Sequence, residues 1–187
     1  MSTTALVVVV VLAVIAVAAI GALVSLRKRR TTNLRAQFGE PEYARALEAT
    51  GSRRDAEARL DARKERVEGF HIRPLAPADQ ARFTESWRKV QTLFVDSPEG
   101  AVREADQLLG EVMSTRGYPV TNFEQRVADI SVDHPLVLTH YRAAHEIALG
   151  QAQGKAGTED LRLAMIHYRT LFEELVGERE TVHAKTA

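Results

Sequence analysis

The sequence predicts an all-α protein with an N-terminal transmembrane helix, a helical stalk and an antiparallel bundle of about five helices. Three observations support this fold class. The chain begins with a long uncharged apolar run at residues 5–26. In residues 74–177, apolar side chains recur every three or four positions, which is the spacing of one helix face. Outside the apolar run, no segment shows the sustained alternation or the β-branched composition of a strand.

The apolar run has the length and the composition of a membrane span. Its 22 residues, ALVVVVVLAVIAVAAIGALVSL, carry no charge, and Ser25 is their single polar side chain. As a helix they extend about 33 Å, against a hydrocarbon core of about 30 Å. Four basic residues, Arg27, Lys28, Arg29 and Arg30, follow at once. We therefore predict a membrane anchor over residues 1–30, whose apolar run contacts the bilayer and whose basic cluster contacts anionic lipid head groups.

The position of the basic cluster predicts the topology. Basic residues are enriched on the cytoplasmic side of membrane helices, and no charged side chain precedes the apolar run. We expect a single-pass protein of the cell (inner or plasma) membrane, with its N-terminus outside and its C-terminal domain in the cytoplasm. The alternative, a cleaved export signal, needs a basic segment before the apolar run and a cleavage site after it. The small residues Ala18, Gly21 and Ala22 would allow two anchors to pack as a homo-oligomer.

Charge and cysteine content exclude several classes of function. The 25 basic and 25 acidic residues of the chain balance. Residues 27–73 carry 13 Lys or Arg and 8 Asp or Glu, whereas residues 74–187 carry 12 and 17. The C-terminal part is therefore acidic and would repel phosphates, so we expect no nucleic-acid partner. The absence of cysteine excludes disulfides, thiolate metal sites and cysteine nucleophiles.

Residues 31–73 are expected to form a polar juxtamembrane stalk that is only partly helical. In this interpretation Thr31–Gly39 is irregular, Pro41 starts a helix, and Gly51 interrupts it. The apolar stripe beyond the interruption consists of Ala56, Leu60 and Val67. Such a stripe is thinner than a packed helix needs, so we predict a solvated stalk. A coiled-coil stalk is the alternative, but the heptads do not persist.

Five helices are expected in the bundle domain, residues 74–177, each with a recognisable start and end. The first spans about residues 78–94. The second begins at Ser97, an N-cap that precedes a proline and an acid in the first turn, and it ends at Gly117. The apolar faces of these two helices comprise Phe83, Trp87, Val90, Phe94, Ala101, Ala105, Leu108 and Val112.

The remaining three helices follow the same rules. Asn122 caps a short third helix, Asp133-His134-Pro135 marks the start of the fourth, and Thr158 opens the fifth, which ends at Gly177. The side chains expected to face inward are Phe123, Val127, Ile130, Val137, Leu138, Tyr141, Ala144, Ala148, Leu161, Met165, Tyr168, Phe172 and Leu175. Short polar loops between such helices predict an antiparallel bundle, and residues 178–187 form a polar tail.

Several short motifs resemble a family of bacterial proteins. They are Phe94-Val95-Asp96, Arg116-Gly117-Tyr118-Pro119, Phe123-Glu124-Gln125-Arg126, Ser131-Val132-Asp133-His134-Pro135 and Tyr141-Arg142-Ala143-Ala144-His145. They make residues 83–176 similar to an uncharacterised family of bacterial single-pass membrane-anchored helical proteins. The resemblance implies a bacterial, anchored, helical protein, and it implies no activity, because that family has none assigned.

Catalytic and metal-binding patterns are incomplete. His140 and His145 are five residues apart, whereas one helix presents a metal-binding pair at i and i+4. His140-Tyr141-Arg142 recurs as His167-Tyr168-Arg169, which we interpret as two similar packing solutions. The glycines lie at helix ends and in loops rather than in a phosphate-binding motif, and no nucleophile motif surrounds a serine. We therefore expect no enzyme, no cofactor and no metal site.

Asp133 and His134 are the most function-like residues of the bundle. Pro135 disfavours a helical conformation for His134, and Asp133 can accept hydrogen bonds from the free N–H groups of the next helix. The structural interpretation is a helix start capped by Asp133. The functional interpretation is that Asp133 orients His134 at a surface that contacts a partner. Tyr118 is the third candidate for such a contact.

The sequence favours a function in binding over one in catalysis. We predict a non-catalytic interaction or scaffold domain at the cytoplasmic face of a bacterial membrane, with a protein partner that the sequence does not identify. The alternative is an envelope-facing accessory or sensor domain, which requires the opposite topology.

Overall fold

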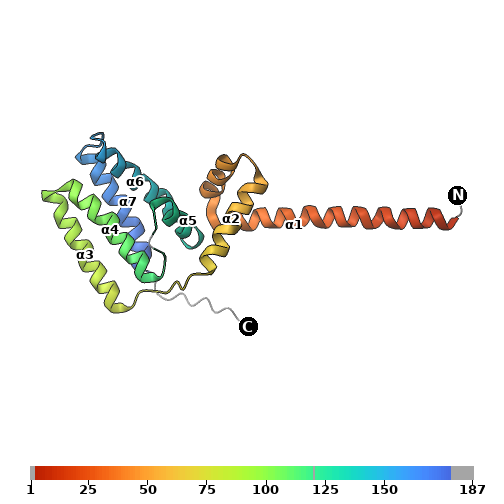
Figure 1. Cartoon of the computed structure of the whole chain (residues 1–187), viewed down its shortest axis with the longest axis horizontal. Helices are drawn as coiled ribbons and strands as arrows, with labels where there is room; N and C mark the ends of the chain where they lie inside the picture. Colours follow the sequence, from red (N-terminus) through yellow and green to blue (C-terminus); the bar gives the residue numbers. More distant parts are fainter. Residues whose placement is uncertain (1–2, 120, 178–187) are drawn as a thin grey trace. The chain divides into compact units, whose positions relative to one another are not determined.

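The computed structural model describes residues 3–119 and 121–177 and divides the chain into two compact units, residues 1–61 and 62–187. In the described residues the chain forms seven α-helices and one 3₁₀ helix and contains no strand, so the predicted all-α class is confirmed (Figure 1). One helix, α2 (Arg53–Glu68), begins in the first unit and continues into the second.

Helix α1 (Thr3–Thr50) opens the first unit and is kinked at Gly39. Gly39 has a φ of 74°, which other residues rarely adopt, and Pro41 lies in the first turn of the helix that resumes after the kink, as predicted. The stretch before the kink, Thr31–Phe38, is helical, so the prediction of an irregular segment was wrong. Its polar residues are compatible with a helix because the hydroxyls of Thr31 and Thr32 donate to backbone carbonyls one turn earlier, at 3.1 and 3.0 Å.

No helix within the described part of the chain combines the length and the apolar character of a membrane span. The backbone of the predicted span, residues 5–26, is helical, but eleven of its side chains, at residues 5–11, 13, 14, 16 and 23, lie outside the described residues. The large apolar side chains that are described in this span are all exposed, and they are Leu12, Ile15, Val17, Ile20, Val24 and Leu26. The transmembrane helix is therefore not confirmed and remains a prediction.

The residues assigned to a solvated stalk include a small packed structure. The last turns of α1 before the kink, its part after the kink and the start of α2 supply the buried side chains, which are Leu34, Phe38, Tyr43, Ala46, Ala56 and Leu60. Each of these segments alone has too few apolar residues for a core, which is why the stripe on α2 looked too thin. Their side chains are buried together because three short segments combine, a grouping that the pattern of one helix does not reveal.

The second unit contains the five predicted helices. They are α3 (Pro77–Asp96), α4 (Pro98–Arg116), α5 (Phe123–Asp133), α6 (Leu138–Ala152) and α7 (Thr158–Gly177), with a 3₁₀ turn, η1 (Pro135–Val137), before α6. Helix α3 packs on α4, α4 on α7 and α6 on α7, so α4 and α7 form the middle of the unit (Figure 1). Because α3 joins α4, and α6 joins α7, through short connections, both pairs are antiparallel.

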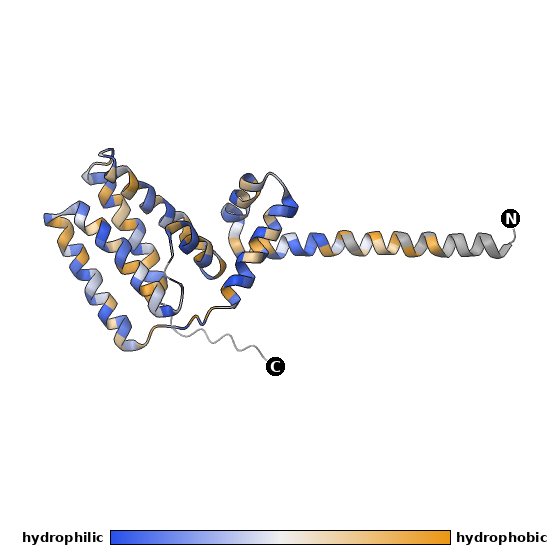
Figure 2. Cartoon of the chain, viewed as in Figure 1, coloured by the Kyte–Doolittle hydropathy of each residue, from blue (hydrophilic) through white to orange (hydrophobic). Residues whose placement is uncertain are grey.

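The predicted apolar faces of the bundle are confirmed. Helix α3 buries Phe83, Trp87 and Val90, and the predicted stripes of α4 and α7 are buried in the same core. Three predicted residues are only partly buried and pack against the core, namely Phe94, Phe123 and Ala148. In Figure 2 hydrophobic and hydrophilic residues alternate along α3, α4 and α7, as expected for helices that bury one face.

The ends of α4 and α5 carry the predicted local signals. Ser97 Oγ accepts a backbone N–H from the first turn of α4 at 3.3 Å, and Asn122 Oδ1 accepts one from the first turn of α5 at 2.9 Å. Gly117 ends α4 with a φ of 104°. A side chain at this position would clash with the carbonyl oxygen of His71, so the glycine also lets the segment before α3 lie against the end of α4.

One predicted cap is wrong. Asp133 is the last residue of α5, and His134 occupies the N-cap position of η1 without a side-chain cap hydrogen bond. The Asp133 carboxylate accepts the hydroxyl of Tyr118 instead. The local sequence pattern indicates only the backbone N–H groups of the next helix as partners of the Asp133 carboxylate. Tyr118 is 15 positions away in sequence, so this pattern does not reveal it.

Candidate functional site

The structure brings two of the three candidate contact residues together and buries the third. The hydroxyl of Tyr118 donates to Asp133 Oδ2 at 2.7 Å. His134 Nδ1 lies 3.2 Å from Glu174 Oε1, on α7. Tyr118 is 2 % exposed and His134 is 3 % exposed, so neither side chain offers a surface to a partner. These contacts favour a structural role. The hydrogen bond from Tyr118 and the contact with Glu174 fasten the end of α5 to the segment after α4 and to α7.

A half-buried polar cluster lies between helices of the bundle, at positions for which the sequence predicted only packing. Arg126 Nη2 donates to Asp106 Oδ2 at 3.2 Å, and the Tyr141 hydroxyl lies 3.5 Å from Asp106 Oδ1. Burial, and then the carboxylate of Asp106, raise the pKa of Tyr141 well above its usual value, so the phenol stays protonated. These residues are 20 and 35 positions apart in sequence, so no local pattern indicates the cluster. With its carboxylate paired and its phenol protonated, the cluster is suited to fixing α4, α5 and α6 rather than to proton transfer.

An aromatic stack borders this cluster. Phe123 and the imidazole of His145 lie with ring centroids 3.5 Å apart and planes 10° apart. Burial lowers the pKa of His145, which favours the neutral ring. The spacing of His140 and His145 does not match a metal-binding pair, and the structure places His145 against the ring of Phe123.

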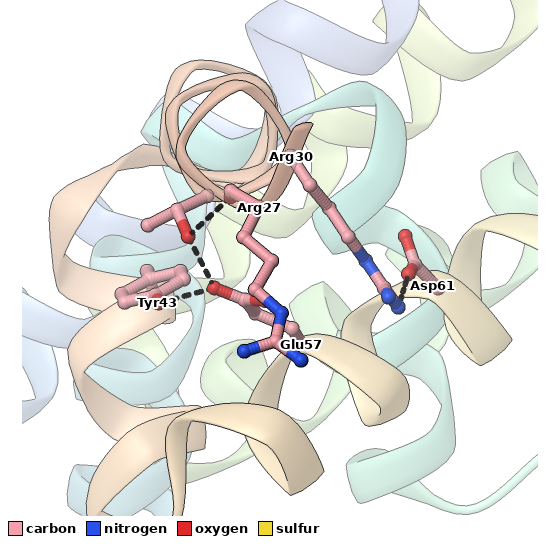
Figure 3. Close-up of polar contacts among 6 residues, drawn as sticks. Arg27, Arg30, Tyr43, Glu57 and Asp61 are labelled. Carbon is pink, nitrogen blue, oxygen red and sulfur yellow. Dashed lines mark hydrogen bonds and ion pairs between the residues drawn. The ribbon is translucent and has the colours of Figure 1, made fainter. Parts of the chain in front are cut away.

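The predicted membrane-interface residues lie on α1, immediately before the packed part of the first unit. Arg27, Lys28, Arg29 and Arg30 are all exposed. The guanidinium of Arg30 pairs with the carboxylate of Asp61 on α2 (Figure 3). The last residue of the basic cluster is therefore fastened to the fold of the unit.

A buried carboxylate lies beside this ion pair. Glu57 of α2 is 8 % exposed, and its Oε1 accepts the hydroxyl of Thr31 at 2.6 Å and that of Tyr43 at 3.1 Å (Figure 3). Burial, and then the adjacent Glu57, raise the pKa of the Tyr43 phenol, so it keeps the proton that it donates. The guanidinium of Arg35 lies 4.6 Å from the centre of the Tyr43 ring. One carboxylate thus joins all three helical segments of the unit.

A small apolar groove opens between α3 and α7. It has a volume of about 200 Å³ and is lined by Trp87, Gln91, Phe94, Arg162, Met165, Ile166 and Arg169. Ile166 is 44 % exposed, so part of the apolar lining is open to solvent. Arg162 and Arg169 form ion pairs with glutamates of their own helix. Such exposed ion pairs contribute little free energy, so a carboxylate of a partner protein can take the place of either glutamate.

A larger hollow, of about 450 Å³, lies between α3 and α4. It is lined mostly by polar and charged side chains, with three apolar ones, and its residues are Ser86, Lys89, Val90, Leu93, Glu104, Gln107, Leu108 and Glu111. Its mixed lining is typical of a solvated seam between two helices. The smaller groove is therefore the better candidate for a contact with another protein, because binding pockets combine apolar walls with a few placed polar groups.

Comparisons with known proteins do not assign the chain to a family. It matches no protein-family model, no curated protein and no solved structure. The resemblance of residues 83–176 to a bacterial membrane-anchored family therefore remains a prediction, and the functional argument rests on the geometry of the two units.

Proposed function

We propose that this protein is a membrane-anchored, non-catalytic adaptor whose C-terminal bundle binds a protein partner at the cytoplasmic face of the membrane. The observation that carries the proposal is the first part of α1, where every described side chain from Leu12 to Leu26 is exposed. Six of them are large and apolar, with exposed fractions between 58 % and 71 %. A helix surface of this kind is unfavourable in water and favourable in lipid.

A bilayer would supply the cover for this surface. Soluble monomers rarely expose contiguous apolar patches of such extent. The backbone of residues 5–26 is helical, so its N–H and C=O groups are satisfied within the segment, as hydrocarbon requires. The basic residues 27–30 support an orientation in which the chain after residue 30 lies in the cytoplasm.

The packed part of the first unit supports a fixed path for the chain where it leaves the membrane. Arg30 pairs with Asp61, and Thr31 donates to Glu57, so α2 is fastened to the turn of α1 that follows the apolar run. A folded segment here would hold the chain close to the head groups, whereas a flexible stalk would let the domain drift away from them.

The groove between α3 and α7 supports the binding part of the proposal. Its lining combines four apolar side chains with two arginines. This combination fits a segment of a partner protein that inserts an apolar side chain and places a carboxylate beside it. Apolar anchors in pockets supply most of the affinity of such contacts, and arginine pairs with carboxylates through two parallel hydrogen bonds.

The topology of the anchor is directly testable. A cytoplasmic reporter fused after Ala187 is expected to be active in intact cells, and an export-dependent reporter at the same position is expected to be inactive. The physical reason is the retention of basic flanking residues on the cytoplasmic side. Replacing Arg27, Lys28, Arg29 and Arg30 with glutamine should weaken this bias. The matched control replaces four basic residues farther from the apolar run, Arg53, Arg54, Arg59 and Lys64, and should leave it unchanged.

Each opposite outcome has a clear meaning. An active export-dependent reporter would favour the alternative function, an envelope-facing accessory or sensor domain. Extraction of the wild-type protein from membranes by alkaline carbonate would contradict the anchor itself, because a spanning helix is not removed by breaking electrostatic contacts.

The groove is tested by site-specific crosslinking in native membranes. A photoreactive residue at Gln91, within the groove, is expected to form an adduct with a partner protein, and the same residue at the exposed Arg103 of α4 is the control. Ile166→Asp should abolish the adduct, because it places a carboxylate in the apolar lining. Since Ile166 is 44 % exposed, the melting temperature should change little. Equal adducts at the two positions, or an adduct that survives Ile166→Asp, would contradict the proposed surface.

A further inference from the structure

Two histidines meet between α6 and α7 in a contact that depends on their protonation. His140 Nδ1 lies 2.9 Å from His167 Nδ1, and the two ring centroids are 5.1 Å apart. The two nitrogens therefore point at each other, as in a hydrogen bond. Both side chains are half-buried, so protons from solvent can reach them. The pair thus joins two neighbouring helices through groups that titrate near neutral pH.

The hydrogen bond between the two rings holds in only some protonation states. One Nδ1 must carry a proton and donate it, while the other accepts it through a lone pair. One added proton on the donor ring leaves this bond in place, because an imidazolium still donates from Nδ1 to the neutral ring. A second added proton occupies the accepting lone pair. Two N–H groups and two positive charges would then face each other across 2.9 Å, so the contact has to break.

The elements packed against the pair supply no anion that would offset the added protons. The 3₁₀ turn η1 is uncharged, and within residues 3–119 and 121–177 neither imidazole forms an ion pair with a carboxylate. The charged and titratable groups of these elements are engaged elsewhere or exposed, and they are Asp106 with Arg126, Asp133 with Tyr118, His134 with Glu174, Glu124 with Arg142, Glu159 with Arg162, Glu173 with Arg169, Asp160 with the N–H of Gly157, His145 against Phe123, and the exposed Glu146. Tyr141 and Tyr168, which follow the two histidines in sequence, stay neutral because burial raises the pKa of both phenols. The two charges of a doubly protonated pair would therefore repel each other without a neighbouring counter-charge.

The environment of His167 gives the direction of the pH dependence. Burial, and then the neighbouring His140, lower the pKa of His167. The folded chain thus binds a proton at His167 less tightly than the unfolded chain does, in which histidine has its ordinary pKa of about 6.5. The stability that depends on this group is therefore complete above about pH 6.5 and is lost as the pH falls below that value.

We propose that His140 and His167 form a proton-sensitive clasp between α6 and α7. The clasp is closed at neutral pH, where the pair carries at most one added proton, and the second added proton opens it in acid. Tyr141 and Tyr168 lie beside it on the same two helices, buried and with ring centroids 6.3 Å apart. Because these phenols do not titrate in this pH range, acid loosens α6 from α7 at the histidines and leaves the packed core between the helices in place.

The protonation of the pair is tested by nuclear magnetic resonance of the full chain in mild detergent, labelled with ¹⁵N at histidine. At pH 8 one ring of the pair should be the Nδ1–H tautomer and the other the Nε2–H tautomer. On acidification the pair should take up its two protons in separate steps, the first near pH 6.5 and the second at a clearly lower pH. The exposed His71 gives the reference titration of an isolated ring.

The opening of the clasp is tested by the melting temperature of the full chain at pH 8 and at pH 5. In His167→Gln the amide can donate to or accept from His140 Nδ1 without taking up a proton, so this variant keeps the link and loses the switch. Between pH 8 and pH 5 the melting temperature of the wild type should fall by at least about 2 °C more than that of His167→Gln. The matched control His71→Gln, at an exposed histidine, should lose as much as the wild type does.

Three results would overturn the proposal. Two Nε2–H rings at pH 8 would exclude the hydrogen bond between the histidines. Titration of both rings at the pH of His71 would show that they do not interact. Equal losses of melting temperature in the wild type and in His167→Gln would show that protonation of the pair does not loosen the fold. The first two results come from the wild type alone, so they decide the case even where the variant does not fold.

Discussion

Replacing Trp87 with alanine is expected to lower the free energy of unfolding of the second unit by ~3–5 kcal/mol. Trp87 is 6 % exposed, and its ring stacks on Phe172 with centroids 4.8 Å and planes 16° apart. It therefore joins α3, at the edge of the unit, to α7 in its middle. Alanine would remove this stack and leave a cavity that the neighbouring helices fill only in part. Urea unfolding of the full chain in mild detergent, followed by far-ultraviolet circular dichroism, measures the loss.

Two variants of the same helix serve as controls. Trp87→Phe should cost less, because a smaller ring can still stack on Phe172. Arg88→Ala removes an exposed side chain beside it and should change the free energy of unfolding by less than about 0.5 kcal/mol. A loss below about 1 kcal/mol for Trp87→Ala would contradict the role of this residue in the core.

Gly117→Ala is expected to destabilise the second unit by about 3 kcal/mol or more, for two separate reasons. The φ of 104° at Gly117 is one that alanine adopts only under strain. The added methyl group would also overlap the backbone carbonyl of His71, which lies in the segment before α3. That segment is held in place by the N–H of Arg73, which donates to the Arg116 carbonyl at 2.8 Å. Relief of the overlap would therefore lengthen or break this hydrogen bond.

Gly154→Ala separates the two contributions. Gly154 has a φ of 69°, but nothing lies within 4 Å of the position that a methyl group would occupy. This variant carries the strain without the overlap, so it should cost about 1–2 kcal/mol. Thermal unfolding of both variants, compared with the wild type, gives the difference. Equal losses in the two variants would show that the contact with His71 contributes nothing.

The two units differ in how far their sequence predicts them. In the bundle, each helix carries its own apolar stripe and its own cap or terminator, so the five helices and most inward residues follow from patterns a few residues long. In the packed part of the first unit, after the apolar run, no single segment carries enough apolar residues to form a core. Phe38 and Tyr43 lie on either side of the kink at Gly39, and Leu60 lies on α2, so their common burial depends on how the chain folds back. A solvated stalk was therefore the natural prediction and an incorrect one.

The candidate contact residues show the same division. The motifs around Tyr118 and Asp133 indicate positions with a particular role, and the structure joins these residues by a hydrogen bond. The sequence does not predict whether that role is structural or functional, because the burial of His134 and its contact with Glu174 come from the packing of α7. The groove between α3 and α7 was not predicted, because no local sequence pattern marks its residues. Ile166 lies outside the predicted apolar stripe of α7, and its proximity to Trp87 depends on the placement of α3.

The sequence by itself determined the all-α class, the five helices of the bundle and the caps at Ser97 and Asn122. Helix periodicity and capping depend on residues within about four positions of one another, so they can be recognised before the fold is known. Only the tertiary structure decided which polar groups pair. His140 pairs with His167, 27 positions away, and Arg30 with Asp61, 31 positions away. Such pairs form because packing of the apolar faces brings particular helices side by side, and a local pattern carries no information about which helices those are.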